Sequence, residues 1–177
     1  ILDDSLMKSH PDFAVTFVDN HDSQRGQALE STVAEWFKPL AYGLILLRQE
    51  GIPCVFYGDY YGISGEFAQE SFQTILDKLL YIRQYHVYGA QEDYFDYANC
   101  IGWTCLGDEE HPDGVAVIIS NGEANCKRMN MGEFNRNKVF VDYLNNCTEE
   151  VILDGQGWGD FPVQEASLSA WVNKDAH

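Results

Sequence analysis

Positive charge is scarce in this chain, which carries 11 lysine and arginine residues against 28 aspartate and glutamate residues, a formal net charge of −17. Proteins that bind nucleic acid or anionic membranes usually present a basic patch. The composition therefore argues against nucleic-acid and membrane partners and favours neutral or cationic ligands.

Long apolar runs and closely spaced cysteines are also missing. No segment reaches the roughly 18 apolar residues of a membrane-spanning helix, and the sequence shows no signal peptide. The odd number of cysteines have neither metal-ligand nor redox spacing. Scattered free thiols are most simply buried small hydrophobes in a reducing compartment. This predicts a cytoplasmic protein, with secretion as the alternative because a targeting sequence would lie upstream.

One stretch of β-branched and aromatic residues stops abruptly at polar groups. In an extended strand over residues 14–18, apolar side chains would lie on both faces. This predicts a strand buried on both sides in a parallel sheet. Asp, Asn, His and Asp follow at 19–22. In a closed parallel barrel, such a boundary marks the rim that carries reacting groups. The same four residues are also ordinary turn formers, so spacing alone leaves a structural role open.

The segment 17–22, Phe-Val-Asp-Asn-His-Asp, resembles the fourth signature segment of the alpha-amylase family of retaining glycoside hydrolases. The likeness continues through residues 26–30, 36–42 and 55–62, and it is greatest to the liquefying bacterial alpha-amylases and their cytoplasmic relatives. The resemblance covers nearly the whole chain. It implies the C-terminal part of an enzyme that hydrolyses alpha-1,4 bonds in alpha-glucans such as starch, glycogen and maltooligosaccharides, with an upstream N-terminal barrel segment as partner.

The resemblance also implies roles for residues of this motif. Retaining hydrolysis needs a nucleophilic carboxylate and an acid about 5 to 5.5 Å apart, and both would lie upstream, so the chain alone would be inactive. Asp22 matches the third family carboxylate, which binds sugar hydroxyls and stabilises positive charge. His21 matches the histidine that hydrogen-bonds the same sugar. Gln24 and Gln27 are weaker substrate-binding candidates that would line the cleft, and a structural role is favoured for both.

Neighbouring residues have supporting roles in this interpretation. Asp19 and Asn20 are expected to brace the loop by hydrogen bonds. The rim from Tyr57 to Asp59 is a further, weaker candidate for lining the cleft, because polar residues again follow a predicted strand, but a structural role is favoured for it.

Helical and strand patterns alternate over residues 1–89. A capping box at 32–35 precedes a main helix that begins near Phe37, since a proline is tolerated only in the first turn. A short buried strand follows at 54–57, then a helix over 72–85 with Ser71 as its cap. This order is expected of the last two βα units of a TIM (β/α)8 barrel.

The pattern changes to short β runs and turn clusters over residues 90–177, which predicts an antiparallel β-sandwich. The resemblance implies a C-terminal Greek-key domain. The predicted fold class is thus α/β plus all-β. The runs are 93–97, 100–106, 115–120, 126–131, 138–143, 151–153, 161–163 and 168–173.

The resemblance implies calcium in the full-length enzyme, held by upstream ligands. A second calcium site of some relatives matches Ala98, Asn99 and Asn121 here. Because calcium prefers carboxylates among its oxygen ligands, no metal is expected to bind this chain.

Two other functions stay open. One is a non-catalytic carbohydrate-binding or interaction module, and the other is a related alpha-glucan transglycosylase. Two βα units also cannot close a barrel, so apolar strand flanks and helix faces would be uncovered. We therefore expect the fragment to self-associate or to be covered by the upstream segment.

Overall fold

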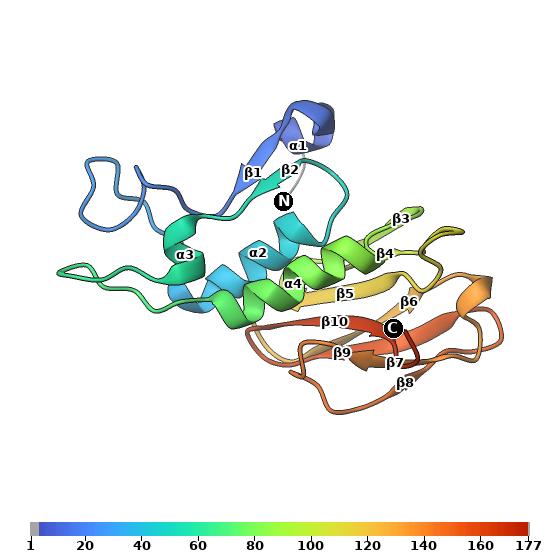
Figure 1. The fold of residues 1–177 in the computed structure, drawn as a ribbon. Helices are drawn as coiled ribbons and strands as arrows, with labels where there is room; N and C mark the ends of the chain where they lie inside the picture. The colour runs from blue at the N-terminus through green and yellow to red at the C-terminus, as the bar shows by residue number, and fades with distance from the viewer. Residues whose placement is uncertain (1–3, 177) are drawn as a thin grey trace. The chain divides into compact units, whose positions relative to one another are not determined.

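The computed structural model describes residues 4–176. Residues 1–3 of the predicted segment 1–89 and residue 177 of the predicted segment 90–177 lie outside this range. The chain divides into two compact units, one up to Leu80 and one from Tyr81 on. The division falls inside helix α4 (Gln73–His86, labelled in Figure 1) rather than near residue 89. The assignment of 1–89 to a catalytic barrel and of 90–177 to a β domain stays a prediction.

The first unit has the predicted order of strand, helix, strand and helix. Strand β1 (Val15–Phe17) pairs in parallel with β2 (Ile52–Cys54), α2 (Lys38–Leu46) connects them, and α4 follows. The described residues of this unit form a two-stranded parallel sheet, so a closed eight-stranded barrel stays a prediction about a longer polypeptide. The remaining helical segments are α1 (Leu6–Ser9), the 3-10 helices Pro11–Phe13 and Glu35–Phe37, and α3 (Tyr57–Tyr61).

The helix boundaries follow proline and serine chemistry. Helix α2 begins one residue after the predicted start near Phe37 and follows a short 3-10 turn, with Pro39 in its first turn where the missing N–H is not needed. The predicted capping box at 32–35 is wrong, because Ala34 precedes the 3-10 helix and no side chain caps it. Helix α4 confirms the predicted helix, and Ser71 Oγ accepts a hydrogen bond from Gln73 N–H at 3.0 Å in its first turn.

The strands of this unit are more exposed than their apolar sequence predicts. Val15 and Phe17 are 61% and 53% exposed, so the prediction that this strand is buried on both sides is wrong for the described residues. The physical reason is that β1 has a single strand neighbour. The second strand ends at Cys54 instead of covering 54–57, because Tyr57 already begins α3 and is 72% exposed.

The described residues of the second unit form eight antiparallel strands, and each lies on a predicted β run with ends shifted by at most three residues. Six form one sheet in the order β3-β4-β5-β10-β7-β8, and β6 pairs with β9. This agrees with the predicted antiparallel sandwich, whereas Greek-key connections stay a prediction. The strands are β3 (Gln91–Tyr97), β4 (Cys100–Cys105), β5 (Val115–Ser120), β6 (Asn125–Asn130), β7 (Val139–Asp142), β8 (Val151–Ile152), β9 (Trp158–Val163) and β10 (Ser167–Asn173).

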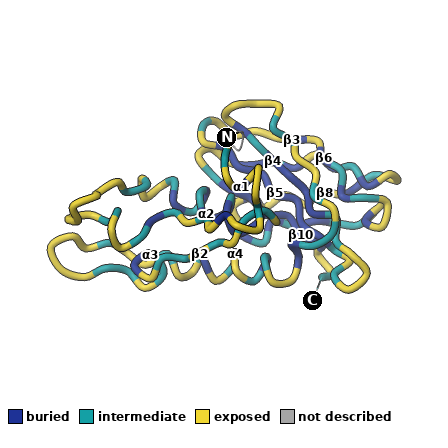
Figure 2. The backbone as a smooth tube through the Cα atoms, turned by 90° about the horizontal axis from the view of Figure 1, so that it is seen from above, coloured by how far each residue is buried: buried dark blue, intermediate teal, exposed yellow. Residues whose placement is uncertain are grey.

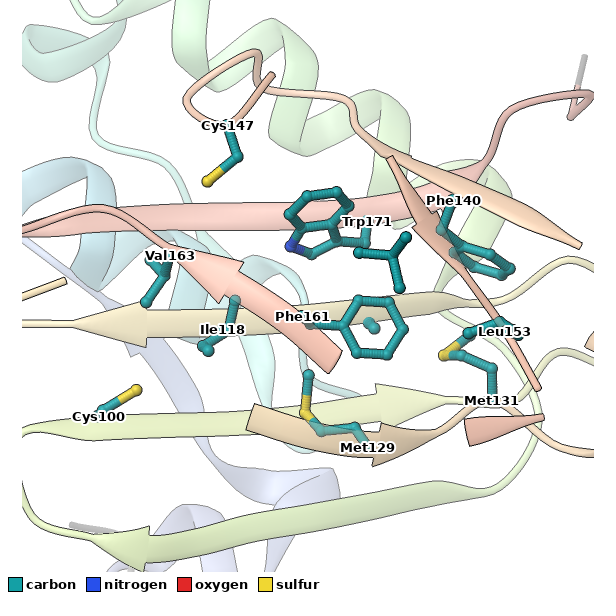
Figure 3. Packing of buried hydrophobic residues seen from close by; sticks show 12 residues of the cluster. Cys100, Ile118, Met129, Met131, Phe140, Cys147, Leu153, Phe161, Val163 and Trp171 are labelled. Atoms are coloured by element: carbon teal, nitrogen blue, oxygen red, sulfur yellow. The ribbon is translucent and has the colours of Figure 1, made fainter. Parts of the chain in front are cut away.

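A hydrophobic core holds the two sheets of this unit together. Phe161 of β9 meets Phe140 of β7 and Trp171 of β10 edge to face, with ring centroids 6.2 and 6.0 Å apart (Figure 3). All three rings are fully buried, and such contacts add to the gain from burial. Strands β5 and β10 are buried almost throughout (Figure 2).

The cysteines are free thiols, and three of them are buried as predicted. Cys54 and Cys126 are exposed, so the prediction is wrong for them. Cys54 lies on the open strand pair, and Cys126 faces outward because its neighbour Lys127 and then Met129 face inward on β6. Among residues 4–176, no helix is both long and apolar enough to cross a bilayer.

Candidate functional site

The loop after β1 is held by the side chain of Asn20. Its Oδ1 accepts hydrogen bonds from the backbone N–H groups of Asp22 and Ser23, both at 2.9 Å. Its own N–H donates to Ser23 Oγ at 3.1 Å. An asparagine that binds the N–H groups after it fixes a tight turn. Asn20 therefore braces the loop, as the sequence predicts.

His21 and Asp22 extend from this turn into solvent. Their side chains are 82% and 62% exposed, and the imidazole Nε2 lies 3.4 Å from the carboxylate Oδ1. An exposed carboxylate beside an imidazole can accept and donate hydrogen bonds to hydroxyl groups. The structure thus brings together the two residues with the strongest predicted roles, while those roles themselves stay predictions.

Gln24 and Gln27 lie further along the same loop. Gln24 N–H donates to the Asn20 carbonyl at 3.1 Å, and Gln27 N–H donates to the Gln24 carbonyl at 3.3 Å. Ser31 N–H closes the loop on the Ser23 carbonyl at 2.9 Å. Within the described part of the chain, neither glutamine side chain makes a hydrogen bond. Their substrate-binding role stays a prediction.

A buried charged cluster, which the sequence analysis did not find, holds the start of the loop. The side chain of Lys38 is 2% exposed, and its Nζ lies 2.7 Å from Asp19 Oδ2 as an ion pair. The same ammonium donates to Asp59 Oδ1 and, at 2.8 Å, to Gln69 Oε1. Asp19 Oδ1 also accepts from Val33 N–H at 3.3 Å. Asp19 is thereby confirmed as a brace of the loop.

Asp59 is the second carboxylate of this cluster. Its Oδ2 accepts a hydrogen bond from the Tyr42 hydroxyl at 2.5 Å, and its Oδ1 accepts from Gln69 Nε2 at 2.8 Å. Burial, with the hydrogen bond to Asp59, raises the pKa of the Tyr42 phenol far above its ordinary value, so the hydroxyl stays a donor. Asp59 does not line a cleft in this chain, because these partners enclose its carboxylate completely. This burial agrees with the structural role favoured for it over cleft lining.

The sequence does contain a signal for this cluster. Lys38 is the only charged residue in the stretch 36–47, and a lysine buried in an apolar helix needs an opposite charge. Asp19 and Asp59 each follow a strand of a parallel pair, whose carboxyl ends lie at one edge of the sheet. The three charges could have been paired on this ground.

The positions matched to a second calcium site form a backbone contact. Asn121 N–H donates to the Asn99 carbonyl at 3.1 Å, and Ala98 offers no side-chain oxygen. Over residues 4–176, no three His, Cys, Asp or Glu side chains gather as metal ligands. Calcium binding through upstream ligands stays a prediction, as does the expectation of none from this chain.

Comparison with known proteins gives a consistent result. Residues 115–172 match the family model described as alpha-amylase C-terminal. The chain is 48% identical over 173 residues to the alpha-amylase of Geobacillus stearothermophilus. The matched region covers 97% of this chain and 31% of that protein. The chain is similar to alpha-amylases over nearly its whole length. The cytoplasmic alpha-amylase of Escherichia coli (strain K12) is 42% identical over 177 residues, covering 95% of this chain and 36% of that protein.

The resemblance to alpha-amylases is thus confirmed, and the chain spans about a third of the length of these relatives. A solved gamma-CGTase from alkalophilic Bacillus clarkii has a TM-score of 0.63 at 20% identity, over 92% of this chain and 26% of that one. An Anoxybacillus alpha-amylase gives 0.63 at 17% identity, over 92% and 38%. At these identities the structural likeness shows the fold alone.

Proposed function

We propose that this chain is the C-terminal part of an alpha-amylase that hydrolyses internal alpha-1,4-glucosidic bonds of starch, glycogen and maltooligosaccharides with retention of configuration. The observation that carries the proposal is the exposed His21 and Asp22 pair at the carboxyl end of β1. A relative from Bacillus sp. (strain 707), 47% identical over 175 residues, is named glucan 1,4-alpha-maltohexaosidase, which supports an alpha-glucan substrate.

In this proposal, Asp22 stabilises the positive charge that develops on the sugar, and His21 binds hydroxyl groups of the same sugar. A carboxylate about 4 Å from a developing cation contributes roughly 4 kcal/mol at an effective dielectric constant of about 20. Gln24 and Gln27 supply weaker contacts from the same loop. The nucleophile and the acid, which retaining hydrolysis requires about 5 to 5.5 Å apart, lie in an upstream barrel segment.

The same upstream segment completes the barrel in this proposal. Strands β1 and β2 become its last two strands, and the preceding strands cover Val15, Phe17 and Ile52, which are 61%, 53% and 55% exposed in this chain. Removing such side chains from water stabilises the assembled enzyme. Any calcium is held upstream, and the cytoplasmic name of the Escherichia coli relative supports a cytoplasmic location.

A chimaera tests the proposal. This chain replaces the matching region of the Geobacillus stearothermophilus alpha-amylase, and release of reducing ends from starch is compared for the chain alone and for the chimaera. We expect hydrolysis by the chimaera and none by the chain. Hydrolysis by the chain alone would mean that it holds its own nucleophile and acid. A folded but inactive chimaera would also count against the proposal.

A further inference from the structure

A hairpin after α3 lies beside the loop that carries His21 and Asp22. Two backbone hydrogen bonds of 2.9 Å close the hairpin, one from Ile63 N–H to the Gln69 carbonyl and one in the reverse direction. The hairpin projects from the same end of the first unit as the loop over residues 19–31 (Figure 1). The two segments are thus neighbours in space, although α2, β2 and α3 separate them in the sequence.

The base of the hairpin is anchored in the buried charged cluster. Gln69 Oε1 accepts a hydrogen bond from Lys38 Nζ at 2.8 Å, and its Nε2 donates to Asp59 Oδ1 at 2.8 Å. Just beyond the hairpin, Phe72 N–H donates to the Asp59 carbonyl at 2.8 Å. The same Lys38 ammonium pairs with Asp19 at the start of the loop. One buried cluster therefore fixes both the base of the hairpin and the start of the loop.

Phe67 of the hairpin contacts the tip of the loop, residues 24–30. A Cβ on Gly26 would lie 2.4 Å from Phe67 Cε2 and 2.6 Å from its Cδ2, so the ring lies directly against the glycine backbone. Gly26 also has a φ of +81°, in the left-handed region that favours glycine. The Phe67 ring is 47% exposed, so about half of its surface is covered. A side chain at position 26 would thus push the tip and the ring apart.

The other interactions of the tip are local or exposed. Gln27 N–H donates to the Gln24 carbonyl at 3.3 Å, and Arg25 Nη2 lies 3.4 Å from Glu35 Oε1 with both side chains more than half exposed. Exposed turn hydrogen bonds open readily in water, and a surface ion pair adds little. The apolar contact with Phe67 therefore joins the tip to a hairpin that the buried cluster anchors.

We propose that Phe67 is a positioning residue, whose ring holds the tip of the loop at Gly26 and thereby keeps Asp22 in place at the reacting sugar. The step from the loop to the reaction rests on the proposed function. The energy between a carboxylate and a developing positive charge falls with their separation, and a small misplacement of a reacting group lowers the rate by a large factor. Phe67 touches no sugar in this proposal, because it acts through Asp22.

Limited trypsin digestion of the 177-residue chain tests the contact without relying on activity. Trypsin cleaves after Arg25, which is exposed and directly precedes Gly26, and the cleavage rate follows the population of the opened loop. We expect Phe67→Ala to speed this cleavage about tenfold, and Phe67→Tyr to leave it unchanged. Glu66→Ala is the matched control, because Glu66 is exposed beside Phe67 on the same hairpin. Cleavage after the exposed Lys8, which lies outside both segments, should stay constant in every variant.

The chimaera tests the link from the contact to Asp22. We expect Phe67→Ala to lower kcat for starch about tenfold and Phe67→Tyr to restore it. In a chimaera that already carries Asp22→Asn, Phe67→Ala should lower kcat by less than about twofold, because the carboxylate it positions is gone. A ring with only a general structural role would instead lower kcat by the same factor in both backgrounds.

Three results would overturn the proposal. The first is cleavage after Arg25 at the same rate in Phe67→Ala and the parent chain. The second is cleavage after Lys8 that rises as much as cleavage after Arg25, which would mean that the whole unit is loosened. The third is an equal loss of kcat with and without Asp22→Asn. An inactive chimaera would refute the proposed function, while the trypsin result would still decide whether Phe67 holds the loop.

Discussion

Replacement of Lys38 by methionine tests whether the buried cluster supports the first unit. The change leaves Asp19 and Asp59, whose side chains are 1% and 0% exposed, without their shared cation. Methionine retains most of the apolar stem, so the loss is mainly electrostatic. Removing one partner of a buried ion pair typically costs 3–5 kcal/mol, because the remaining charge is uncompensated. We expect Lys38→Met to lower the free energy of unfolding by about this amount.

Urea unfolding followed by far-ultraviolet circular dichroism measures the effect. Lys174→Met is the control, because Lys174 pairs with Glu150 at the surface, where an ion pair adds little. Neutralising the cluster by adding Asp19→Asn and Asp59→Asn to Lys38→Met should recover much of the lost stability. A midpoint for Lys38→Met that shifts no further than that of Lys174→Met would refute the assignment of the cluster.

Two further predictions concern the second unit. Phe161→Ala should cost about 3–5 kcal/mol in thermal denaturation, since the ring is fully buried against Phe140; a loss below 1 kcal/mol would contradict the described core. Burial lowers the pKa of His86, which Asp113 and the backbone of Gly114 partly oppose. The unfolded chain therefore binds the proton more readily, and stability should fall as the pH drops below about 6.5. His86→Gln should make the melting temperature fall less steeply as the pH drops. An unchanged slope of melting temperature against pH would contradict the role of His86 in this decline.

Local sequence patterns were sufficient to predict the strands of the second unit and part of the hydrogen bonding in the loop after β1. The β-branched run Val115–Ser120 became a strand with the predicted bounds, because alternate side chains enter the core from a continuous sheet. Helix α4 followed from its apolar periodicity. The bracing role of Asn20 was predictable because its hydrogen bonds reach two and three residues along the chain.

Long-range features were not predictable in the same way. Strand β1 has a single strand neighbour among the described residues, so its apolar sequence does not predict its exposure in this chain. The Lys38 cluster joins residues from three separate segments. When each carboxylate is considered alone, the local sequence places Asp19 in a loop and Asp59 on a rim. The roles of Gln24 and Gln27 depend on a ligand that the sequence cannot position.

The most direct test of the central claim is the turnover of starch by the chimaera carrying Asp22→Asn. Asp12→Asn is the matched control, because Asp12 is another exposed aspartate of the first unit that lies outside the loop. A loss of roughly 4 kcal/mol in transition-state stabilisation predicts that Asp22→Asn lowers kcat about 10³-fold, while Asp12→Asn leaves it unchanged. A value of kcat for Asp22→Asn within about tenfold of the parent chimaera would contradict the role of Asp22 at the reacting sugar.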